Sequence, residues 1–242
     1  MPINYHKSQI TSRLALIPAR GGSKRLPRKN ILPLGGQPML CWSINAAIKS
    51  QLFERICVST DDAEIALIAN NAGAEVLRRP TYLGTDESTV ADVCKYHIQD
   101  FKDNGITFDH LYCLYPTAPL RNADDLIAMA SIFEKRHDAI AVVAVTKFLH
   151  YPHQALHIEK NGSLKAFWPQ LTKLRGSELP TLVAGNGSTY AVSIAHFLKT
   201  LDFTPETGLY AHVMSLMRSI DVDTPDEYEL LKAAFAVISQ SN

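Results

Sequence analysis

The sequence predicts an α/β fold with a mainly parallel sheet. Over about the first 145 residues, short apolar runs typical of buried strands alternate with segments of helical spacing. Polar or glycine-containing loops follow several of these runs, at the sheet edge where parallel strands bind ligands. The pattern changes near residue 148, where short mixed segments replace the alternation. The 242 residues, 46% of them hydrophobic, fit a single domain 1–242 with an arm at about 148–183.

Each predicted element has a local reason. The run 139–145 is apolar throughout, as in a strand covered on both faces. Gly73 is expected to end the helix that precedes it. Strands are expected at 14–17, 55–60, 74–77, 110–115, 139–145 and 187–193. Helices are expected at about 38–50, 61–72, 89–104, 122–136 and 225–239. The segment Gly185-Asn186-Gly187-Ser188 is turn-prone, and a plain hairpin turn is the alternative to a functional role there.

The segment 148–183 predicts a β-rich arm. Four turn-prone places break it into short pieces: Tyr151-Pro152, Lys160-Asn161-Gly162, Trp168-Pro169 and Leu179-Pro180. Its aromatic residues fit a subunit interface: Phe148, Tyr151, Phe167 and Trp168. The alternative is a hairpin packed on its own domain.

Composition excludes several classes of function. Lysine plus arginine equals aspartate plus glutamate at 24 each, so bulk attraction to nucleic acid or to a membrane surface is not implied. No apolar run approaches the roughly 20 residues of a membrane span. The polar segment 1–12 has no signal-peptide core, and we expect a cytoplasmic protein. The four cysteines lie in apolar or helical runs and are expected to be buried free thiols: Cys41, Cys57, Cys94 and Cys113.

A strongly basic loop, residues 18–30, follows the first predicted strand. Five of its 13 residues are Arg or Lys, and Gly21-Gly22-Ser23 lets the backbone turn N–H groups toward a ligand. Such a loop is suited to hold phosphates. It lacks both G-x-G-x-x-G and G-x-x-x-x-G-K-[ST], which disfavours a dinucleotide site and a P-loop. The alternative is a solvated basic turn.

Two aspartates, Asp221 and Asp223, precede the last predicted helix. On an extended backbone they share one face, where their repulsion is relieved by a divalent cation. Oxygen ligands with open water positions suit Mg²⁺ bound together with substrate phosphates. With the basic loop they predict substitution at phosphorus, supported by Arg79 and the Ser88–Thr89 loop. The alternative for Asp223 is a helix cap ahead of Pro225.

In these motifs the chain resembles the acylneuraminate cytidylyltransferases. These are the CMP-sialic acid synthetases and their relatives that act on pseudaminic, legionaminic and 3-deoxy-octulosonic acids. The first and last motifs, 17–30 and 220–224, are specific, and the resemblance spans nearly the whole chain. The less specific motifs between them are Val58-Ser59-Thr60-Asp61, Arg79-Pro80, Pro116-Thr117-Ala118-Pro119-Leu120-Arg121 and Asn186-Gly187.

The resemblance implies a reaction and a set of site residues. CTP and a nonulosonic acid would give a CMP-sugar and pyrophosphate, with Mg²⁺ required. Arg20, Lys29 and Asp221 would be catalytic, and Asp221 and Asp223 would bind the metal. The nucleotide would be held by Ala19, Arg20, Gly21, Ser23, Lys24, Asn30, Arg79, Ser88 and Thr89. The sugar would be held by Tyr115, Thr117, Gln154, Arg175 and Asn186.

The resemblance also implies a Rossmann-like nucleotidyltransferase fold, a three-layer sandwich, and a homodimer. The arm of one subunit would reach over the partner's site, where Arg175 would meet the carboxylate of the sugar. Two departures concern the sugar: Tyr115 stands where sialic acid synthetases typically carry Gln, and Gln154 replaces an expected lysine. These departures favour a pseudaminic-type sugar over N-acetylneuraminic acid, although the stretch 183–186 lacks the His-Asp-Ala-Gly usual in pseudaminic acid enzymes.

Two further alternatives remain open at the level of the sequence. One is a nucleotidylyltransferase for another sugar or alditol phosphate, although such enzymes often use a G-x-G-T-R loop that this chain lacks. The other is a non-catalytic nucleotide-binding protein on the same scaffold. Retention of Arg20, Lys29, Asp221 and Asp223 argues against it.

Overall fold

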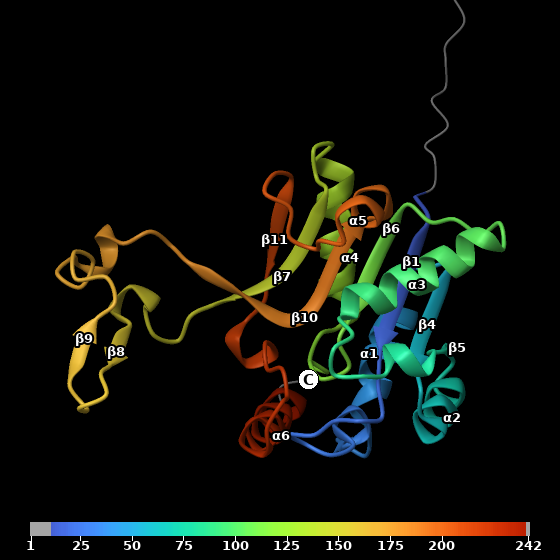
Figure 1. Ribbon diagram of the computed structural model, residues 1–242, viewed down its shortest axis with the longest axis horizontal. Helices are drawn as coiled ribbons and strands as arrows, with labels where there is room; N and C mark the ends of the chain where they lie inside the picture. The colour runs from blue at the N-terminus through green and yellow to red at the C-terminus, as the bar shows by residue number, and fades with distance from the viewer. Residues whose placement is uncertain (1–10, 241–242) are drawn as a thin grey trace, which may run out of the picture.

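A seven-stranded sheet forms the centre of the protein. The computed structural model describes residues 11–240, so the polar segment 1–12 lies outside the described residues except for its last two. In sheet order the strands are β11 (Leu209–Val213), β7 (Ala141–Lys147), β10 (Val183–Ser193), β6 (His110–Leu114), β1 (Arg13–Pro18), β4 (Arg55–Thr60) and β5 (Glu75–Arg78). Every neighbouring pair is parallel except the two that involve β10. The predicted, mainly parallel sheet is confirmed (Figure 1).

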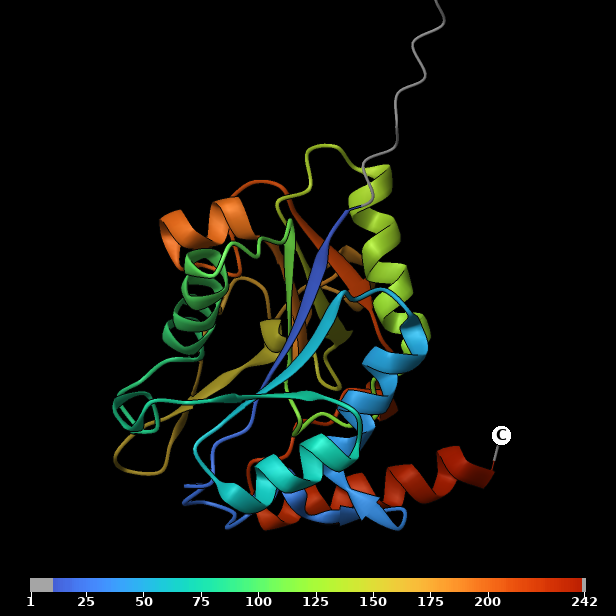
Figure 2. The same ribbon diagram turned by 90° about the vertical axis from the view of Figure 1, so that its right-hand side faces the viewer.

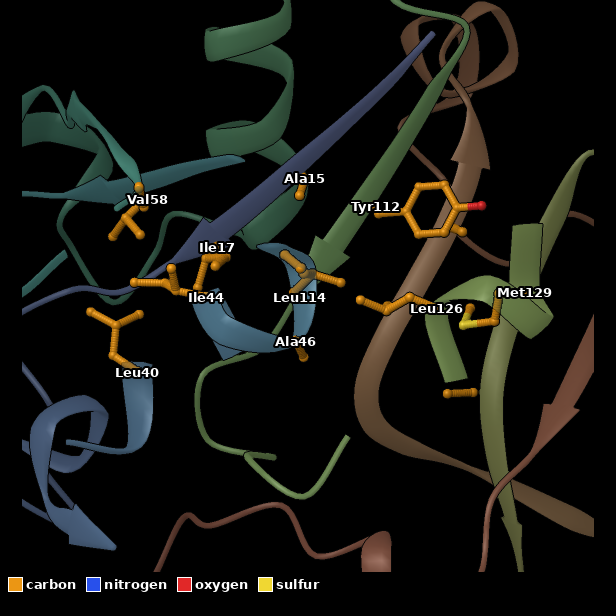
Figure 3. Close-up of a cluster of buried hydrophobic side chains, with 14 of the residues drawn as sticks. Ala15, Ile17, Leu40, Ile44, Ala46, Val58, Tyr112, Leu114, Leu126 and Met129 are labelled. Carbon is orange, nitrogen blue, oxygen red and sulfur yellow. The ribbon is translucent and has the colours of Figure 1, made fainter. Parts of the chain in front are cut away.

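Helices cover both faces of this sheet (Figure 2). Helices α1 (Met39–Ser50), α2 (Ala63–Asn71) and α4 (Ala123–Lys135) lie on one face, and α3 (Val90–Asp103) and α5 (Ile194–Thr200) lie on the other. Alternation along β1 divides the core between them, because Ala15 and Ile17 face α1 while Leu14 and Leu16 face α3. Figure 3 shows the first of these clusters, in which Leu40 and Ile44 of α1 lie toward one side, and Leu126 and Met129 of α4 lie toward the other. The expected three-layer sandwich is confirmed.

A third, smaller core holds the last helix against the start of the chain. Helix α6 (Pro225–Gln240) contributes Leu231, which packs with Val222, Leu34 and Met39. Leu34 belongs to a two-stranded ribbon, β2 (Pro33–Leu34) and β3 (Gln37–Pro38), directly after the basic loop. This contact brings the aspartate segment, although it is late in the chain, beside the basic loop. Within residues 11–240, no helix is both long and apolar enough to span a membrane.

The late strands differ from the sequence prediction. Strand β10 begins at Val183 rather than 187, and the stretch predicted as turn-prone lies inside it, at a register shift between Gly185 and Tyr190. Gly187 has a φ of +68°, which explains why this stretch has the composition of a turn. Helix α5 and strand β11 were not predicted. Strand β11 is a sheet edge whose alternate residues are exposed, so it has no continuous apolar run.

The arm extends away from the body of the protein (Figure 1). It contains one hairpin of two short strands, β8 (Leu156–Ile158) and β9 (Leu164–Ala166), with 3₁₀ turns at Pro152–Gln154 and Gly176–Glu178. In this structure the hairpin does not pack on the body of its own domain. The arm is also less rich in strand than predicted, because loops and 3₁₀ turns make up most of residues 148–182.

Candidate functional site

Two adjoining cavities lie where the strands end and the basic loop begins. The first, of about 210 Å³, lies at the carboxyl ends of β1, β5 and β6; we call it the strand-end cavity. The second, of about 280 Å³, is bordered mainly by the basic loop; we call it the basic-loop cavity. They share Arg20, Lys29 and Asp86. The expected site residues at the strand-end cavity are Arg20, Lys29, Asn30, Arg79, Ser88, Thr89, Tyr115 and Thr117. The basic-loop cavity adds Ser23, Lys24 and Asp223.

Two carboxylates pair with the cations around the basic-loop cavity. Asp86 accepts from Arg20 Nη1 at 2.8 Å and also pairs with Lys24. Asp223 accepts from Lys29 Nζ at 2.5 Å and Arg25 Nη2 at 2.6 Å. Partial burial acts to raise the pKa of Asp223, but Lys29 and Arg25 outweigh it and hold that pKa below its ordinary value. An anionic ligand that enters this cavity would replace Asp86 and Asp223 as the partner of these cations.

The basic loop is tied together at its two ends. The buried Asn30 donates from Nδ2 to the carbonyl of Arg20 at 2.9 Å, which closes the loop on itself. Ala19 is fully buried, and its N–H donates to the carbonyl of Ser59 at 2.9 Å. The N–H of Gly21 donates to Asp61 Oδ1 at 2.9 Å. Neither Ala19 nor Gly21 lines the two cavities, so in this structure both act through the backbone of the loop.

Arg79 lies in the wall of the strand-end cavity and is held from behind. Its Nη2 donates to the carbonyl of Ser59 at 3.0 Å, and its Nε donates to Ser59 Oγ at 3.3 Å. The buried His97 contacts the same hydroxyl through Nε2 at 2.8 Å. Burial, with Arg79 adding to it, lowers the pKa of His97 to about 4, so this imidazole is neutral beside the guanidinium. No sequence pattern pointed to His97, because a single histidine on an amphipathic helix is usual.

The start of α3 forms the opposite wall. Thr89 caps the helix, accepting from the N–H of Asp92 at 3.1 Å while Asp92 accepts from the N–H of Thr89 at 3.0 Å. Ser88 donates from Oγ to the carbonyl of Tyr82 at 2.9 Å. Asp86 lies in the same loop and was not among the expected site residues. The polar run 84–89 could have indicated Asp86, but nothing in that run distinguished this side chain from its neighbours.

Asp221 lies beside Thr117, which is in the loop that follows the carboxyl end of β6. The N–H of Val222 donates to the carbonyl of Thr117 at 2.9 Å, which anchors the aspartate segment to the strand end. Asp221 Oδ1 is buried without a hydrogen-bond partner. Burial raises the pKa of Asp221 more than the Thr117 hydroxyl lowers it. A Cβ at Gly187 would collide with the Asp221 carboxylate, so the glycine turn in β10 makes room for this side chain.

The structure also tests the capping alternative for Asp223. The cap of α6 is formed by Thr224 and Glu227: Glu227 Oε2 accepts from the N–H of Thr224 at 2.8 Å, and Thr224 Oγ1 accepts from the N–H of Glu227 at 3.4 Å. Asp223 supplies only its own N–H to Glu227, so its carboxylate is not the cap. The segment 220–222 forms no strand.

The two aspartates fit a hard cation. Within residues 11–240, no group of three or more His, Cys, Asp or Glu side chains is arranged to hold a metal, so the protein would supply two carboxylates at most in this place. A buried, unpartnered carboxylate oxygen on Asp221 next to a half-buried Asp223 is the donor set that Mg²⁺ binds together with phosphate oxygens. The two side chains border different cavities: Asp223 the basic-loop cavity, and Asp221 an apolar groove of about 530 Å³ beside α6.

Three expected sugar-binding residues lie away from the cavities. Gln154 and Arg175 are exposed on the arm. Asn186 is buried, and its amide is used internally: Nδ2 donates to Ser219 Oγ at 3.0 Å and Oδ1 accepts from Ser188 Oγ at 2.8 Å. Asn186 therefore joins β10 to the segment before Asp221. Tyr115 does line the strand-end cavity, with its ring centroid 5.8 Å from that of Tyr190.

Comparison with known proteins agrees with this geometry. The chain matches the family model "Cytidylyltransferase" over residues 14–157. It is 31% identical to a pseudaminic acid cytidylyltransferase of Campylobacter jejuni over 94% of this chain and 98% of that protein. It is 30% identical to an N-acylneuraminate cytidylyltransferase of Escherichia coli over 91% of this chain and 51% of that longer protein.

A solved structure shows the same fold. CMP:2-keto-3-deoxy-manno-octonic acid synthetase complexed with CTP superposes with a TM-score of 0.70 at 16% identity, covering 96% of this chain and 100% of that one. The family match covers more than half of this chain, and the curated relatives match it over nearly its whole length. This chain therefore belongs to the cytidylyltransferase family.

Proposed function

We propose that this protein transfers CMP from CTP to the anomeric hydroxyl of a nonulosonic acid and releases pyrophosphate. The observation that carries the proposal is the pair of adjoining cavities, which joins Arg20, Lys24 and Lys29 to a carboxylate, Asp223, in one continuous site. Relatives named for pseudaminic, N-acylneuraminic and N,N'-diacetyllegionaminic acid support the substrate class.

The basic loop binds the triphosphate in this proposal. Lys29 and Arg20 exchange their carboxylate partners for phosphate oxygens, which neutralises the charge that develops on the α-phosphate and on pyrophosphate. The nucleoside occupies the strand-end cavity between Arg79 and the Ser88–Thr89 turn. The buried setting of Arg79 keeps its hydrogen-bonding direction fixed before the ligand arrives.

Asp221 and Asp223 hold Mg²⁺ in this proposal. The ion, when bound, neutralises phosphate charge and orients the α-phosphate. Asp221 is well suited to a ligand role, since its Oδ1 has no partner and its environment disfavours a free charge. In this proposal the same carboxylate also accepts a hydrogen bond from the attacking sugar hydroxyl, for which its unpartnered Oδ1 is available. The aspartate segment then aligns the nucleophile with the bond that breaks.

The sugar site is completed by a second subunit in this proposal. Arg175 is exposed and lines neither cavity, and it belongs to an arm that extends away from the body of the protein (Figure 1). The arm also carries exposed apolar side chains of the kind buried at interfaces. In a homodimer, Arg175 of the partner subunit pairs with the sugar carboxylate. Tyr115 gives the site an aromatic wall, and we propose pseudaminic acid ahead of N-acetylneuraminic acid. The proposed location is the cytoplasm, where CTP is made.

Pyrophosphate release tests this proposal directly. The protein is incubated with CTP and Mg²⁺ and with one of four acids: N-acetylneuraminic, pseudaminic, legionaminic or 3-deoxy-octulosonic acid. We expect turnover with a nonulosonic acid, fastest with pseudaminic acid. Turnover of another nucleoside triphosphate with a sugar phosphate, and none with CTP, would replace the proposed reaction. CTP binding without turnover of any acid would favour a non-catalytic nucleotide-binding protein.

A further inference from the structure

The last part of the basic loop is attached to the start of α2 by an ion pair that the proposed reaction does not use. Arg28 Nη1 and Nη2 donate to Asp62 Oδ2 and Oδ1 at 2.5 and 3.1 Å, and Nη2 also donates to Glu64 at 2.5 Å. We propose that this ion pair is a latch that holds the basic loop in its phosphate-binding form, with Arg28 as a positioning residue. The inference rests on the proposed role of the basic loop in binding CTP.

The backbone at Arg28 is in an unusual conformation. Its φ of 59° and ψ of 22° place an arginine in the left-handed region, which is unfavourable for a residue with a Cβ. The turn made there directs Lys29 toward Asp223 and folds Asn30 back to the carbonyl of Arg20. A strained residue of this kind persists only where its surroundings fix it. Around Arg28, the backbone is held by the N–H of Ile31, which donates to the Arg28 carbonyl at 3.0 Å, and the side chain is held by the carboxylates of Asp62 and Glu64 at the start of α2.

Asp62 is a rigid anchor for this contact. It is the N-cap of α2, and its Oδ1 accepts from the N–H of Ile65 at 2.9 Å while it also accepts from Arg28. The Arg28 hydrogen bond, more than any other contact, lowers the pKa of Asp62, so the carboxylate stays charged near neutral pH. A bidentate guanidinium–carboxylate pair fixes direction as well as distance, which a lysine at position 28 would not do.

The neighbouring Asp61 attaches the loop a second time. Its Oδ1 accepts from the N–H of Gly21, and its Oδ2 lies 2.7 Å from where a Cβ would stand at Gly84. The loop that carries Asp86 therefore rests on the same short segment as the basic loop. The basic loop and the loop that carries Asp86 border the basic-loop cavity, and both contact Asp61-Asp62, directly after β4. This arrangement explains how the basic side chains of a loop without regular secondary structure are held in a fixed geometry.

The latch acts on ligand binding more than on folding. The Arg28 side chain is 37% exposed and that of Asp62 is 22% exposed, and ion pairs at such positions contribute little to global stability. A loop that is already ordered, however, loses less conformational freedom when the ligand binds. Breaking the latch should therefore weaken CTP binding while leaving the melting temperature and the rate at saturating CTP close to wild type.

The test uses two variants that break the ion pair without changing the backbone. Arg28→Gly accepts the left-handed conformation, and Asp62→Asn keeps a side-chain oxygen that caps α2. We expect each to raise the dissociation constant of CTP, and of pyrophosphate, by about 5- to 20-fold. The double variant should bind CTP no more weakly than Arg28→Gly alone, because that variant already removes the contacts of Arg28 with Asp62 and Glu64. Saturating kcat should change less than about twofold.

A matched control is available at the far edge of the sheet. Arg55 and Glu75 form an ion pair of similar exposure, with Nη1 3.0 Å and 3.1 Å from the two carboxylate oxygens, and they lie outside both cavities. Glu75→Gln should leave CTP binding unchanged. Wild-type CTP affinity in Arg28→Gly or in Asp62→Asn would overturn the latch, as would equal weakening in Glu75→Gln.

A further variant separates the latch from the function it rests on. Arg20→Ala removes a cation from both cavities, and we expect it to weaken CTP binding by at least as much as Arg28→Gly. If Arg20→Ala binds CTP normally, the basic loop is not the triphosphate site and both proposals fail. If Arg20→Ala binds weakly while Arg28→Gly and Asp62→Asn bind normally, only the latch fails.

Discussion

The basic loop and the arm carry site residues in opposite ways. In the loop, the charged side chains of Arg20, Lys24, Arg25, Arg28 and Lys29 all pair with a carboxylate of the same chain. In the arm, apolar side chains lie open: Leu156 is 55% exposed, Ile158 69%, Leu164 57% and Phe167 62%. The charges of the loop are paired within one chain, whereas the apolar side chains of the arm are exposed and could be covered by another protein surface. Under the proposed function, the nucleotide half of the site would be preformed within one chain, and the sugar half would depend on assembly.

The largest effect is expected in the preformed half. Asp221→Asn removes the carboxylate charge proposed to hold Mg²⁺ but keeps the shape of the side chain, so kcat should fall by about 100- to 1,000-fold. Folding should be intact, and stability should be equal or higher, since a buried carboxylate whose pKa is raised by burial is removed. Steady-state kinetics and thermal unfolding measure the two effects. Asp226→Asn, an exposed carboxylate on α6, is the control. Near-normal kcat in Asp221→Asn would remove Asp221 from the metal site.

Arg175→Ala should act next most strongly, and only on the sugar. Loss of a charged partner for a carboxylate should raise the KM of the sugar by about 10- to 50-fold and leave that of CTP unchanged. The neighbouring exposed Lys173→Ala is the control. An unchanged sugar KM would exclude Arg175 from the site.

Mixing two variants sharpens the comparison between loop and arm. If the arm serves the partner, Arg175→Ala and Asp221→Asn subunits form hybrids with one intact site each. After exchange, an equal mixture should regain about a quarter of wild-type activity at low sugar concentration, from the statistics of random pairing in a two-fold dimer. No recovery, in a sample shown by sedimentation to be dimeric and exchanged, would mean that each arm serves its own chain.

A stability prediction concerns the connection behind the aspartate segment. Asp125 at the start of α4 accepts from Arg218 at 2.7 and 2.9 Å and contacts His212 at 3.0 Å. Burial acts to raise its pKa, but these partners lower the pKa from 3.8 to about 2. Asp125→Asn should reduce the free energy of unfolding by about 2 kcal/mol at neutral pH.

The pH dependence of that loss follows from the sign of the shift. A carboxylate whose folded pKa is depressed stabilises the fold above its unfolded pKa, so the difference between wild type and Asp125→Asn should shrink as pH falls from about 4 toward 2. Denaturant titrations across this range measure it. The exposed neighbour Asp124→Asn should show no such trend. A constant difference across the range would contradict the assigned pKa.

The smallest effect is expected at the boundary between the two halves. Tyr115 lines the strand-end cavity and is the proposed aromatic wall of the sugar site. Tyr115→Gln should shift the ratio of kcat/KM between N-acetylneuraminic and pseudaminic acid by about fivefold toward the former, the size expected from a few altered contacts. Competition between the two sugars measures this ratio. Tyr115→Phe, which keeps the ring, should leave it nearly unchanged.

Residues that form local patterns were predictable from the sequence. The basic loop follows from its glycines and charges, the caps of α3 and α4 from Thr89 and Asn122, and the arm boundaries from prolines that interrupt the strand pattern. Metal and sugar roles remain predictions. Residues whose roles come from packing were not predictable: Asp62 is an ordinary helix cap in the sequence, and only the fold brings Arg28 to it. His97 behind Arg79 and the exposed edge strand β11 belong to the same class.

The position of β10 in the sheet has a consequence for how the chain is made. Strands β5, β4, β1 and β6 come from residues 13–114 and pair with one another, but the next place in the sheet belongs to residues 183–193. While the ribosome synthesises the intervening segment, the outer edge of β6 has no partner, and β7 has none on either side. Open strand edges favour aggregation, and pairing over such a sequence distance is slow. Release of β10 from the ribosome is therefore the step that joins the two halves of the sheet and ends this vulnerable period.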